Sequence, residues 1–310
     1  MKIAVLGAGG VGGWFGTRLA GAGADVHLIA RGAHLEAIRK HGLRIRSSGG
    51  DEVFSLPVTD DPVRIGTCDL VLVCVKSYDT EAAAEELPAL LQRQSAVLSL
   101  QNGIDNEEKL AASVGIDRVM GGVAFIFASI AEPGVVVHAG GPASLVFGEL
   151  DGSPSARGER LLALCRAGGV PAELVPDIRV RLWDKLAFIC AQAGMTACTR
   201  LPIGEIRERP EAWAMFRRIV GEVVGLARAE GVGLAVDTAE RIALFARGLE
   251  PTGYSSLYHD LVGGRRMELE ALHGLVVRRS RAHGLEAPMC EAVYALLEPH
   301  AARVEPRPGS

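Results

Sequence analysis

The sequence predicts an α/β fold: an N-terminal Rossmann-type domain with an antiparallel extension, followed by an all-helical C-terminal domain. Three observations support this fold class. Strand-like and helix-like segments alternate over the first 175 residues, strand-like runs follow one another without helices over 121–149, and helix-like segments alone follow Pro176. At roughly 150 residues per domain, 310 residues also suit two domains. We therefore expect one domain over 1–176 and a second over 177–310.

The parallel sheet is predicted from short runs rich in Val, Ile and Leu that are separated by helix-like segments. These runs lie at 2–6, 25–30, 69–75, 96–100 and 170–175. Helices are expected at 11–22 and 80–91. Turn residues at Pro133-Gly134 and at 140–142 divide the next apolar segment into three runs, which predicts the antiparallel extension.

The C-terminal domain is predicted to be helical because apolar residues recur there at helical spacing and strand signals stop. The expected helices lie at 177–199, 210–230, 238–247, 256–283 and 288–304. The last six residues, EPRPGS, are expected to fray.

The composition excludes several classes of protein. Hydrophobic residues make up 48% of the chain, which supports a folded core, and the net charge of −4 argues against a nucleic-acid or anionic-membrane partner. The six cysteines form no C-x-x-C pair and the eight histidines have no zinc-site spacing, so we expect reduced thiols and no metal. Because no apolar run is long enough to span a membrane, a cytoplasmic enzyme is expected.

A glycine-rich motif of the form G-x-G-x-x-G connects the first strand to the first helix. It consists of Gly7, Ala8, Gly9, Gly10, Val11 and Gly12. In such a motif the first glycine permits a tight turn, the second lets the backbone approach a pyrophosphate, and the third lets the helix pack on the strand. The helix N-terminus then offers N–H groups to the phosphates. A glycine-rich turn without function is the alternative.

The choice of cofactor is predicted from the end of the second strand. Enzymes that use NAD usually carry an acidic residue there to bind the ribose, whereas this chain has Ala30 followed by Arg31. A guanidinium can bind a 2′-phosphate, so Arg31 predicts NADP(H). The alternative is that Arg31 is an ordinary solvated residue.

Two further loops follow predicted parallel strands, where ligands bind in open α/β sheets. One contains Lys76, which could approach charges on cofactor or substrate, and the other contains Asn102, which could hydrogen-bond near a nicotinamide. The residues alone fit an ordinary loop position equally well.

Two charged residues interrupt apolar helical stripes. Lys185 is the charged member of the stripe Ile178, Leu182, Lys185, Ile189, Ala193 and Thr196. Glu268 is the charged member of the stripe Leu257, Leu261, Gly264, Glu268, Leu272 and Leu275. The structural explanation is an ion pair between the two helices, or side chains that reach solvent at the margin of a helix. In the functional explanation Lys185 protonates an alkoxide in an interdomain site and Glu268 orients lysine, substrate or cofactor.

Taken together, the motifs resemble those of the ketopantoate reductases, over nearly the whole chain. They are GAGGVG at 7–12, Arg31 before a helix, CVKSY at 74–78, QNG at 101–103, PG-VVVH at 133–138, WDKL at 183–186 and SSL…GRRMELE at 255–270. The resemblance implies reduction of a 2-keto acid by NADPH and a homodimer.

The resemblance also implies roles for individual residues. Lys185 becomes the general acid, and Asn102 contacts cofactor and substrate. Lys76 and Ala128 line the cofactor site. Ser256 binds substrate, and Glu268 contacts the cofactor ribose and supports catalysis.

The chain departs from the family pattern where asparagines are typical. Ile189 and Ala193 lie four and eight residues after Lys185, and Ile203 takes the asparagine position of a P-N-G-E motif. Such amides bind polar groups of the substrate, so their loss predicts a more apolar specificity pocket.

The predicted function is NADPH-dependent reduction of a small 2-keto acid, foremost 2-dehydropantoate to pantoate on the route to coenzyme A. One alternative is a paralogous reductase of a less polar keto acid, ketone or imine. Another is a binding protein that senses NADP(H) without chemistry, which the presence of both Lys185 and Glu268 disfavours.

Overall fold

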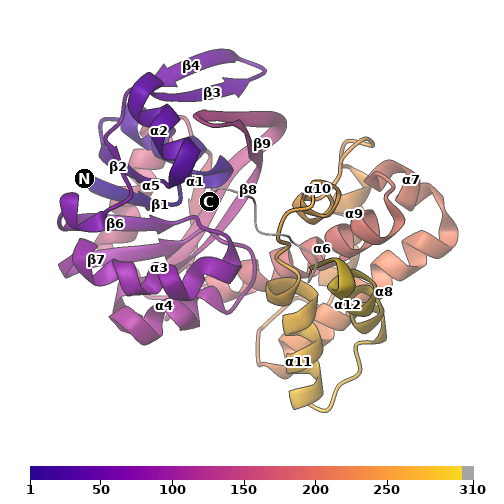
Figure 1. Ribbon diagram of the computed structural model, residues 1–310. Coiled ribbons are helices and arrows are strands. Elements are labelled where there is room, and N and C mark those ends of the chain that lie inside the picture. Colours follow the sequence, from indigo (N-terminus) through magenta and orange to yellow (C-terminus); the bar gives the residue numbers. More distant parts are fainter. Residues whose placement is uncertain (302–310) are drawn as a thin grey trace. The chain divides into compact units, whose positions relative to one another are not determined.

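The computed structural model describes residues 1–301 and divides into two compact units (Figure 1). The first consists of Met1–Gln101 with Asp105–Ile178, and the second of Asn102–Ile104 with the chain from Arg179 onward. The predicted fold class is confirmed, because the first unit is built on a largely parallel sheet and the second is helical. One feature is absent from the sequence-based prediction: the short segment Asn102–Ile104 belongs to the second unit.

The sheet of the first unit has ten strands in the order β4-β3-β9-β8-β7-β6-β1-β2-β5, with β10 pairing with β9. The strands are β1 (Lys2–Leu6), β2 (Asp25–Ile29), β3 (Leu43–Ser47), β4 (Gly50–Phe54), β5 (Val58–Thr59), β6 (Cys68–Val73), β7 (Leu91–Ser99), β8 (Val119–Glu132), β9 (Val135–Glu149) and β10 (Ala172–Leu174). Strand β1 is parallel to both β2 and β6, so the chain is wound in both directions from this strand.

Helices cover both faces of this sheet (Figure 1). They are α1 (Gly10–Gly21), α2 (Gly32–His41), α3 (Thr80–Glu86), α4 (Asn106–Val114) and α5 (Ala156–Ala167). Ile3 and Val5 of β1 pack in one core cluster with residues of α1, α2 and α5, whereas Ala4 and Leu6 pack in a second cluster with α3 and α4. Both faces of β1 are therefore apolar, as expected for a parallel strand in a sheet with helices packed on both faces.

The antiparallel extension is confirmed, with one correction. Strands β8 and β9 form a single long hairpin around Pro133-Gly134, and the turn predicted at 140–142 lies inside β9. Pairing is interrupted between Ala143 and His138, and Gly140 has a φ of +89°. The residues between His138 and Ala143 therefore form an irregularity, and β9 continues on both sides of it. The predicted strand over 170–175 corresponds to β10.

The hairpin of β3 and β4 is not among the predicted elements. In β3 the residues Leu43 and Ile45 are buried and Arg44 and Arg46 are exposed, which is the period of a half-buried strand. This alternation is not recognised in the sequence because it is short and is followed by the polar residues Ser47 and Ser48.

The second unit consists of seven helices and a π-helical turn within the described residues. They are α6 (Ile178–Thr199), α7 (Ile203–Glu208), α8 (Pro210–Ala229), α9 (Thr238–Arg247), α10 (Ser256–Val262), the π-helix η5 (Glu270–Gly274), α11 (Leu275–Ala282) and α12 (Pro288–Ala301). Helix α8 contacts α7, α9, α11 and α12 and buries Phe216, Ile219 and Val223 completely. The end of the helix predicted at 288–304 and the EPRPGS segment lie outside the described residues.

The single helix predicted over 256–283 is wrong. Helix α10 ends at Val262, and Gly264, with a φ of +59°, takes a left-handed conformation that favours glycine. Arg265 closes the turn, since its N–H donates to the carbonyl of Asp260 and its Nε to Asp260 Oδ1 at 2.9 Å. An irregular segment follows, up to the π-helix.

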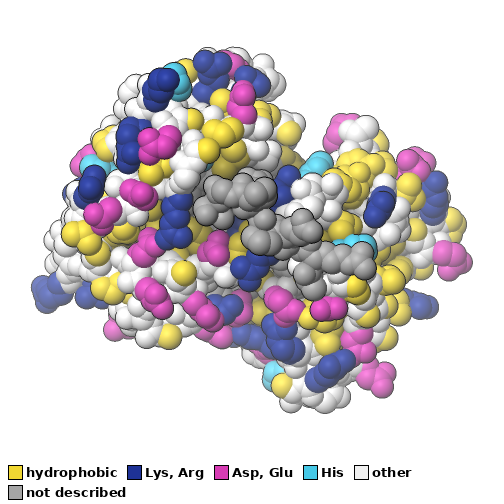
Figure 2. Space-filling model, in the orientation of Figure 1, with side chains coloured by type: hydrophobic (Ala, Val, Ile, Leu, Met, Phe, Trp, Pro, Cys, Tyr) yellow, Lys and Arg dark blue, Asp and Glu magenta, His cyan; other side chains and the backbone are white. Residues whose placement is uncertain are grey.

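Basic and acidic side chains are interspersed over the face drawn in Figure 2. No helix among residues 1–301 has the length and apolar character needed to cross a membrane.

Candidate functional site

The glycine-rich turn between β1 and α1 is shaped by close backbone contacts. Gly7 has a φ of +102°, and a Cβ there would lie 2.9 Å from the Val75 nitrogen. A Cβ on Gly12 would lie 2.2 Å from the Gly7 carbonyl oxygen, and one on Gly10 would lie 2.3 Å from the Ala128 oxygen. Larger residues are therefore excluded at three positions.

Gly9 differs from the other glycines of the motif. Apart from its chain neighbours, no atom of residues 1–301 lies within 4 Å of the position that its Cβ would take, so the backbone at Gly9 borders open space among these residues. Gly9 is also the N-cap of α1, and neither a capping side chain nor an acidic residue occupies the first turn. The N–H groups at this helix end are thus suited to an anionic ligand, as the motif predicts.

Two anchors hold the turn in place. The N–H groups of Gly7 and Ala8 both donate to the carbonyl of Ile29, at 3.2 and 3.0 Å, which ties the turn to the end of β2. The His34 ring lies between Ala8 and the turn of the β8–β9 hairpin. Its Nε2 is 2.8 Å from the Ala8 oxygen, and its Nδ1 is 3.0 Å from the Gly134 nitrogen. These partners require a neutral ring protonated on Nε2, and burial lowers the pKa of His34 in the same sense.

Arg31 lies at the end of β2 as the N-cap of α2. Its guanidinium forms an ion pair with Glu86, the last residue of α3. The Arg31 side chain is 70% exposed, so this cation is accessible, but it is already engaged by a carboxylate. The carboxylate partner was not predicted, because Glu86 is 55 residues away in sequence.

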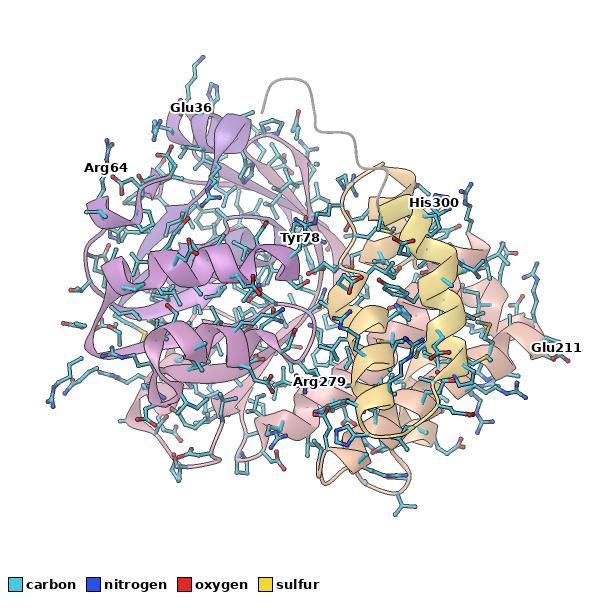
Figure 3. All side chains as sticks on the ribbon, turned by 60° about the horizontal axis from the view of Figure 1, so that its bottom comes forward. Glu36, Arg64, Tyr78, Glu211, Arg279 and His300 are labelled. Atoms are coloured by element: carbon cyan, nitrogen blue, oxygen red, sulfur yellow. The ribbon has the colours of Figure 1, made fainter. Side chains whose placement is uncertain are left out.

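Lys76 and Ala128 also belong to the first unit. Lys76 follows β6 and is the N-cap of the short 3₁₀ helix η2 (Ser77–Asp79), which contains Tyr78 (Figure 3). Ala128 lies in β8, and its carbonyl is the group that approaches Gly10. In contrast, Glu36 and Arg64, labelled in the same view, belong to exposed ion pairs with Arg39 and Asp61.

In the second unit, Lys185 lies near the middle of α6 and is half-buried. Trp183 and Leu186, its neighbours in the WDKL motif, are only 3% and 2% exposed. Asp184 pairs with Arg241 of α9 at 3.5 Å, and burial raises the pKa of Asp184. The motif thus fixes α6 by apolar packing and a link to α9, with Lys185 between these anchors.

The structure brings Asn102 and Glu268 together within the second unit. The amide Nδ2 of Asn102 donates to Glu268 Oε2 at 3.2 Å, and Glu268 is 5% exposed. Because the chain is irregular between α10 and η5, Glu268 lies in a segment without regular secondary structure and not on the helical stripe predicted for it. This hydrogen bond provides a partner for one oxygen of the buried carboxyl group, as burial of a polar group requires.

Ser256 is the first residue of α10 and is exposed. Its neighbour Ser255 is the more constrained residue. The Ser255 hydroxyl accepts a hydrogen bond from the Tyr258 nitrogen at 3.1 Å and lies 2.7 Å from the Thr196 hydroxyl of α6. A serine directly before a helix is a known N-cap signal, and it could have identified Ser255.

The three positions that lack asparagine differ in their surroundings. Ile203 and Ala193 are 0% and 1% exposed, whereas Ile189 is half-buried. The Ile203 nitrogen donates to the Gly253 carbonyl at 3.0 Å, so this apolar side chain is held at the junction of α7 with the segment before α10. An apolar residue at each position is compatible with the core that surrounds it.

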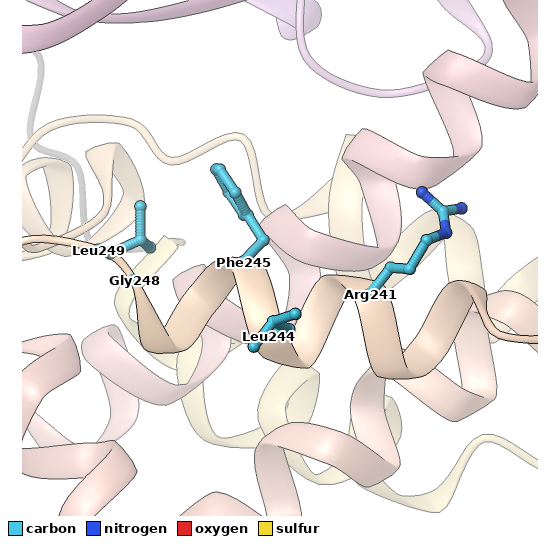
Figure 4. Close-up of a pocket in the computed structure, with 5 residues that line it drawn as sticks. All are labelled: Arg241, Leu244, Phe245, Gly248 and Leu249. Carbon is cyan, nitrogen blue, oxygen red and sulfur yellow. The ribbon is translucent and has the colours of Figure 1, made fainter.

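A separate depression of about 380 Å³ lies on α9 (Figure 4). Its lining residues are Arg241, Leu244, Phe245, Gly248 and Leu249. None of the predicted site residues lines it.

Comparison with known proteins covers both units. Two family models match in tandem, Ketopantoate reductase PanE/ApbA over residues 3–152 and Ketopantoate reductase PanE/ApbA C terminal over 177–301. A 2-dehydropantoate 2-reductase of Halobacterium salinarum is 35% identical over 299 residues, covering 96% of this chain and 98% of the relative.

Solved structures show the same similarity. A PanE/ApbA family ketopantoate reductase from Ralstonia eutropha matches with a TM-score of 0.89 and 38% identity, covering 98% of this chain and 99% of that one. A D-mandelate dehydrogenase, solved with NADH and anilino(oxo)acetate, matches with a TM-score of 0.91 and 25% identity over 98% of this chain and 99% of its own.

Fold, glycine-rich turn and relatives together define a Rossmann-type oxidoreductase with a helical second unit. More particularly, the chain belongs to the ketopantoate reductase family, which confirms the resemblance seen in the motifs.

Proposed function

We propose that the protein reduces a 2-keto acid with NADPH, and that the substrate is 2-dehydropantoate, giving pantoate on the route to coenzyme A. One observation carries this proposal: a 2-dehydropantoate 2-reductase is similar over the full length of the chain. The open backbone at Gly9 supports it, because a dinucleotide pyrophosphate needs such an approach. By analogy with the family, the functional protein is a homodimer.

The residues of the first unit fit the dinucleotide. The N–H groups at the start of α1 are suited to the pyrophosphate, and the exposed guanidinium of Arg31 is suited to the 2′-phosphate. Lys76 and Ala128 line the same site in the proposal. When bound, the nicotinamide supplies the hydride.

Lys185 supplies the proton in the proposal. Hydride addition to a keto carbon leaves negative charge on the oxygen, and an ammonium group both stabilises that charge and donates a proton to it. Asn102 and Glu268, joined by their hydrogen bond, orient substrate and cofactor, and Ser256 contacts the substrate. The proton therefore moves from Lys185 Nζ to the substrate oxygen.

A second candidate is reduction of a less polar keto acid. Ile189, Ala193 and Ile203 place apolar side chains where the family typically has amides, and a relative of the same fold is a D-mandelate dehydrogenase. Loss of amide partners disfavours a polar substrate by roughly 1–3 kcal/mol for each hydrogen bond left unmade.

One experiment tests both candidates. The purified protein is given NADPH and a panel of 2-keto acids, including 2-dehydropantoate, branched-chain keto acids and phenylglyoxylate, while loss of NADPH absorbance is followed. The proposal expects the highest kcat/KM for 2-dehydropantoate. Higher values for the branched or aromatic acids establish the second candidate, and absence of turnover with every acid contradicts both.

A further inference from the structure

The Arg31 guanidinium contacts a residue that lies outside both the β1–α1 turn and the end of β2. The turn is tied to the carbonyl of Ile29, two residues before Arg31. In a Rossmann-type unit the adenosine ribose lies beside the end of this second strand. The group that contacts the Arg31 guanidinium is therefore close to the position of a 2′-phosphate, and this group is the carboxylate of Glu86.

Glu86 is less exposed than its partner. Its side chain is 21% exposed, against 70% for Arg31, and its Oε2 atom is buried without a hydrogen-bond partner among the described residues. A partly buried carboxylate of this kind depends on its cation, because burial of an unpaired charge is costly. Withdrawal of Arg31 toward another anion thus leaves Glu86 poorly compensated.

We infer that Glu86 is a specificity-determining residue that opposes the 2′-phosphate of NADPH and favours the 2′-hydroxyl of NADH. A dianionic phosphate competes with Glu86 for the same guanidinium and is repelled by the remaining carboxylate. A ribose hydroxyl can instead donate a hydrogen bond to a carboxylate, the part played by an acidic residue at the end of β2 in NAD enzymes. Here α3 provides the acid that β2 lacks.

This inference rests on the proposed use of Arg31 and predicts a modest preference for NADPH. Glu86→Gln removes the charge and keeps the shape. It should lower the Kd for NADPH about three- to tenfold and change the Kd for NADH less than threefold, as expected for one like charge at a partly exposed site. Glu85→Gln, at the exposed preceding position of α3, is the matched control and should change neither Kd more than about twofold.

Isothermal titration calorimetry of the full chain with NADPH and with NADH measures these constants without turnover. Adenosine 2′,5′-bisphosphate and 5′-AMP, which differ only in the 2′-phosphate, provide a second measurement, and Glu86→Ala provides a second variant. An unchanged or weakened affinity of the Glu86 variants for the phosphorylated ligands overturns the inference.

Arg31→Ala separates this failure from failure of the proposed function. If Arg31→Ala reduces the preference for NADPH while Glu86→Gln leaves it unchanged, the role of Glu86 is wrong and the role of Arg31 stands. If Arg31→Ala leaves the preference unchanged, Arg31 does not bind the phosphate and the cofactor proposal itself is overturned.

Discussion

The two units carry their candidate functional groups in different ways. At the glycine-rich turn of the first unit the proposed phosphate-binding atoms belong to the backbone, and glycines are required because Cβ atoms at Gly10 and Gly12 would lie 2.3 and 2.2 Å from carbonyl oxygens. In the second unit the proposed functional atoms belong to side chains, with Lys185 on a regular helix and Glu268 on an irregular segment. Backbone geometry tolerates few substitutions, whereas a site built from side chains can change its substrate through single replacements.

Lys185→Ala is expected to have the largest effect. Loss of the proton donor and of its charge should lower kcat about 10²–10⁴-fold, while the Kd for NADPH changes little. Steady-state kinetics and calorimetry measure the two quantities on the same preparation. Arg179→Ala, which removes an exposed charge from the same helix, should leave kcat within about twofold. A normal kcat in Lys185→Ala would place the proton donor elsewhere.

Two glycine substitutions test the backbone half of the comparison. Gly12→Ala cannot be accommodated without movement of the turn, so it should lower the melting temperature and weaken NADPH binding more than about 100-fold. In Gly9→Ala the added methyl group meets no atom in the described part of the chain, so the melting temperature should stay close to that of the wild type while NADPH binding still weakens about tenfold or more.

Thermal unfolding and calorimetric titration of both variants give these values, with Gly21→Ala as the control. Gly21 is the last residue of α1, and a Cβ there has open space around it. If Gly9→Ala binds NADPH as well as Gly21→Ala does, the pyrophosphate does not approach Gly9.

The contrast between backbone and side-chain groups also explains which features can be predicted from the sequence and which cannot. The turn over 7–12 is predictable because missing side chains are visible as glycines. The irregular position of Glu268 is not, because apolar residues continue at helical spacing across Gly263 and Gly264. Likewise, nothing local to Asn102 indicates that its loop belongs to the second unit, since that grouping depends on contacts made 166 residues later.

Glu107 gives the first unit a pH dependence of its own. Burial raises the pKa of this carboxyl to about 7, and its Oε2 has no hydrogen-bond partner among the described residues. The folded state therefore holds a proton that the unfolded state releases near pH 4.5. This stabilisation is complete below about pH 4.5 and is lost as the pH rises toward 7.

Glu107→Gln should remove this loss of stability at high pH. At pH 8 the variant is expected to be more stable than the wild type by on the order of 2 kcal/mol, and near pH 5 the difference should be small. Denaturant unfolding at both pH values measures it, with Glu108→Gln, at the exposed next position, as the control. An equal effect at both pH values would show that Glu107 is ionised in the folded protein.

His273 of η5 gives the second unit the opposite dependence. The ring is fully buried, its Nε2 lies 2.9 Å from the Cys190 carbonyl of α6, and burial lowers its pKa to about 4. The unfolded state takes up a proton near pH 6.5 that the folded state refuses, so stability is complete above that value and falls as the pH drops toward 4. A buried titratable side chain in each unit thus gives the two units opposite pH dependences.

His273→Gln keeps a side-chain N–H donor and removes the titration. At pH 7 the variant should be less stable than the wild type by on the order of 1 kcal/mol because it packs less well. Between pH 6.5 and 4.5, however, the free energy of unfolding should fall less in the variant than in the wild type. Denaturant unfolding across this range measures the slope, with His300→Gln on the exposed surface of α12 (Figure 3) as the control. Parallel pH slopes in wild type and variant would mean that His273 is protonated in the folded state, and the link between η5 and α6 would then need a second acceptor facing Nδ1.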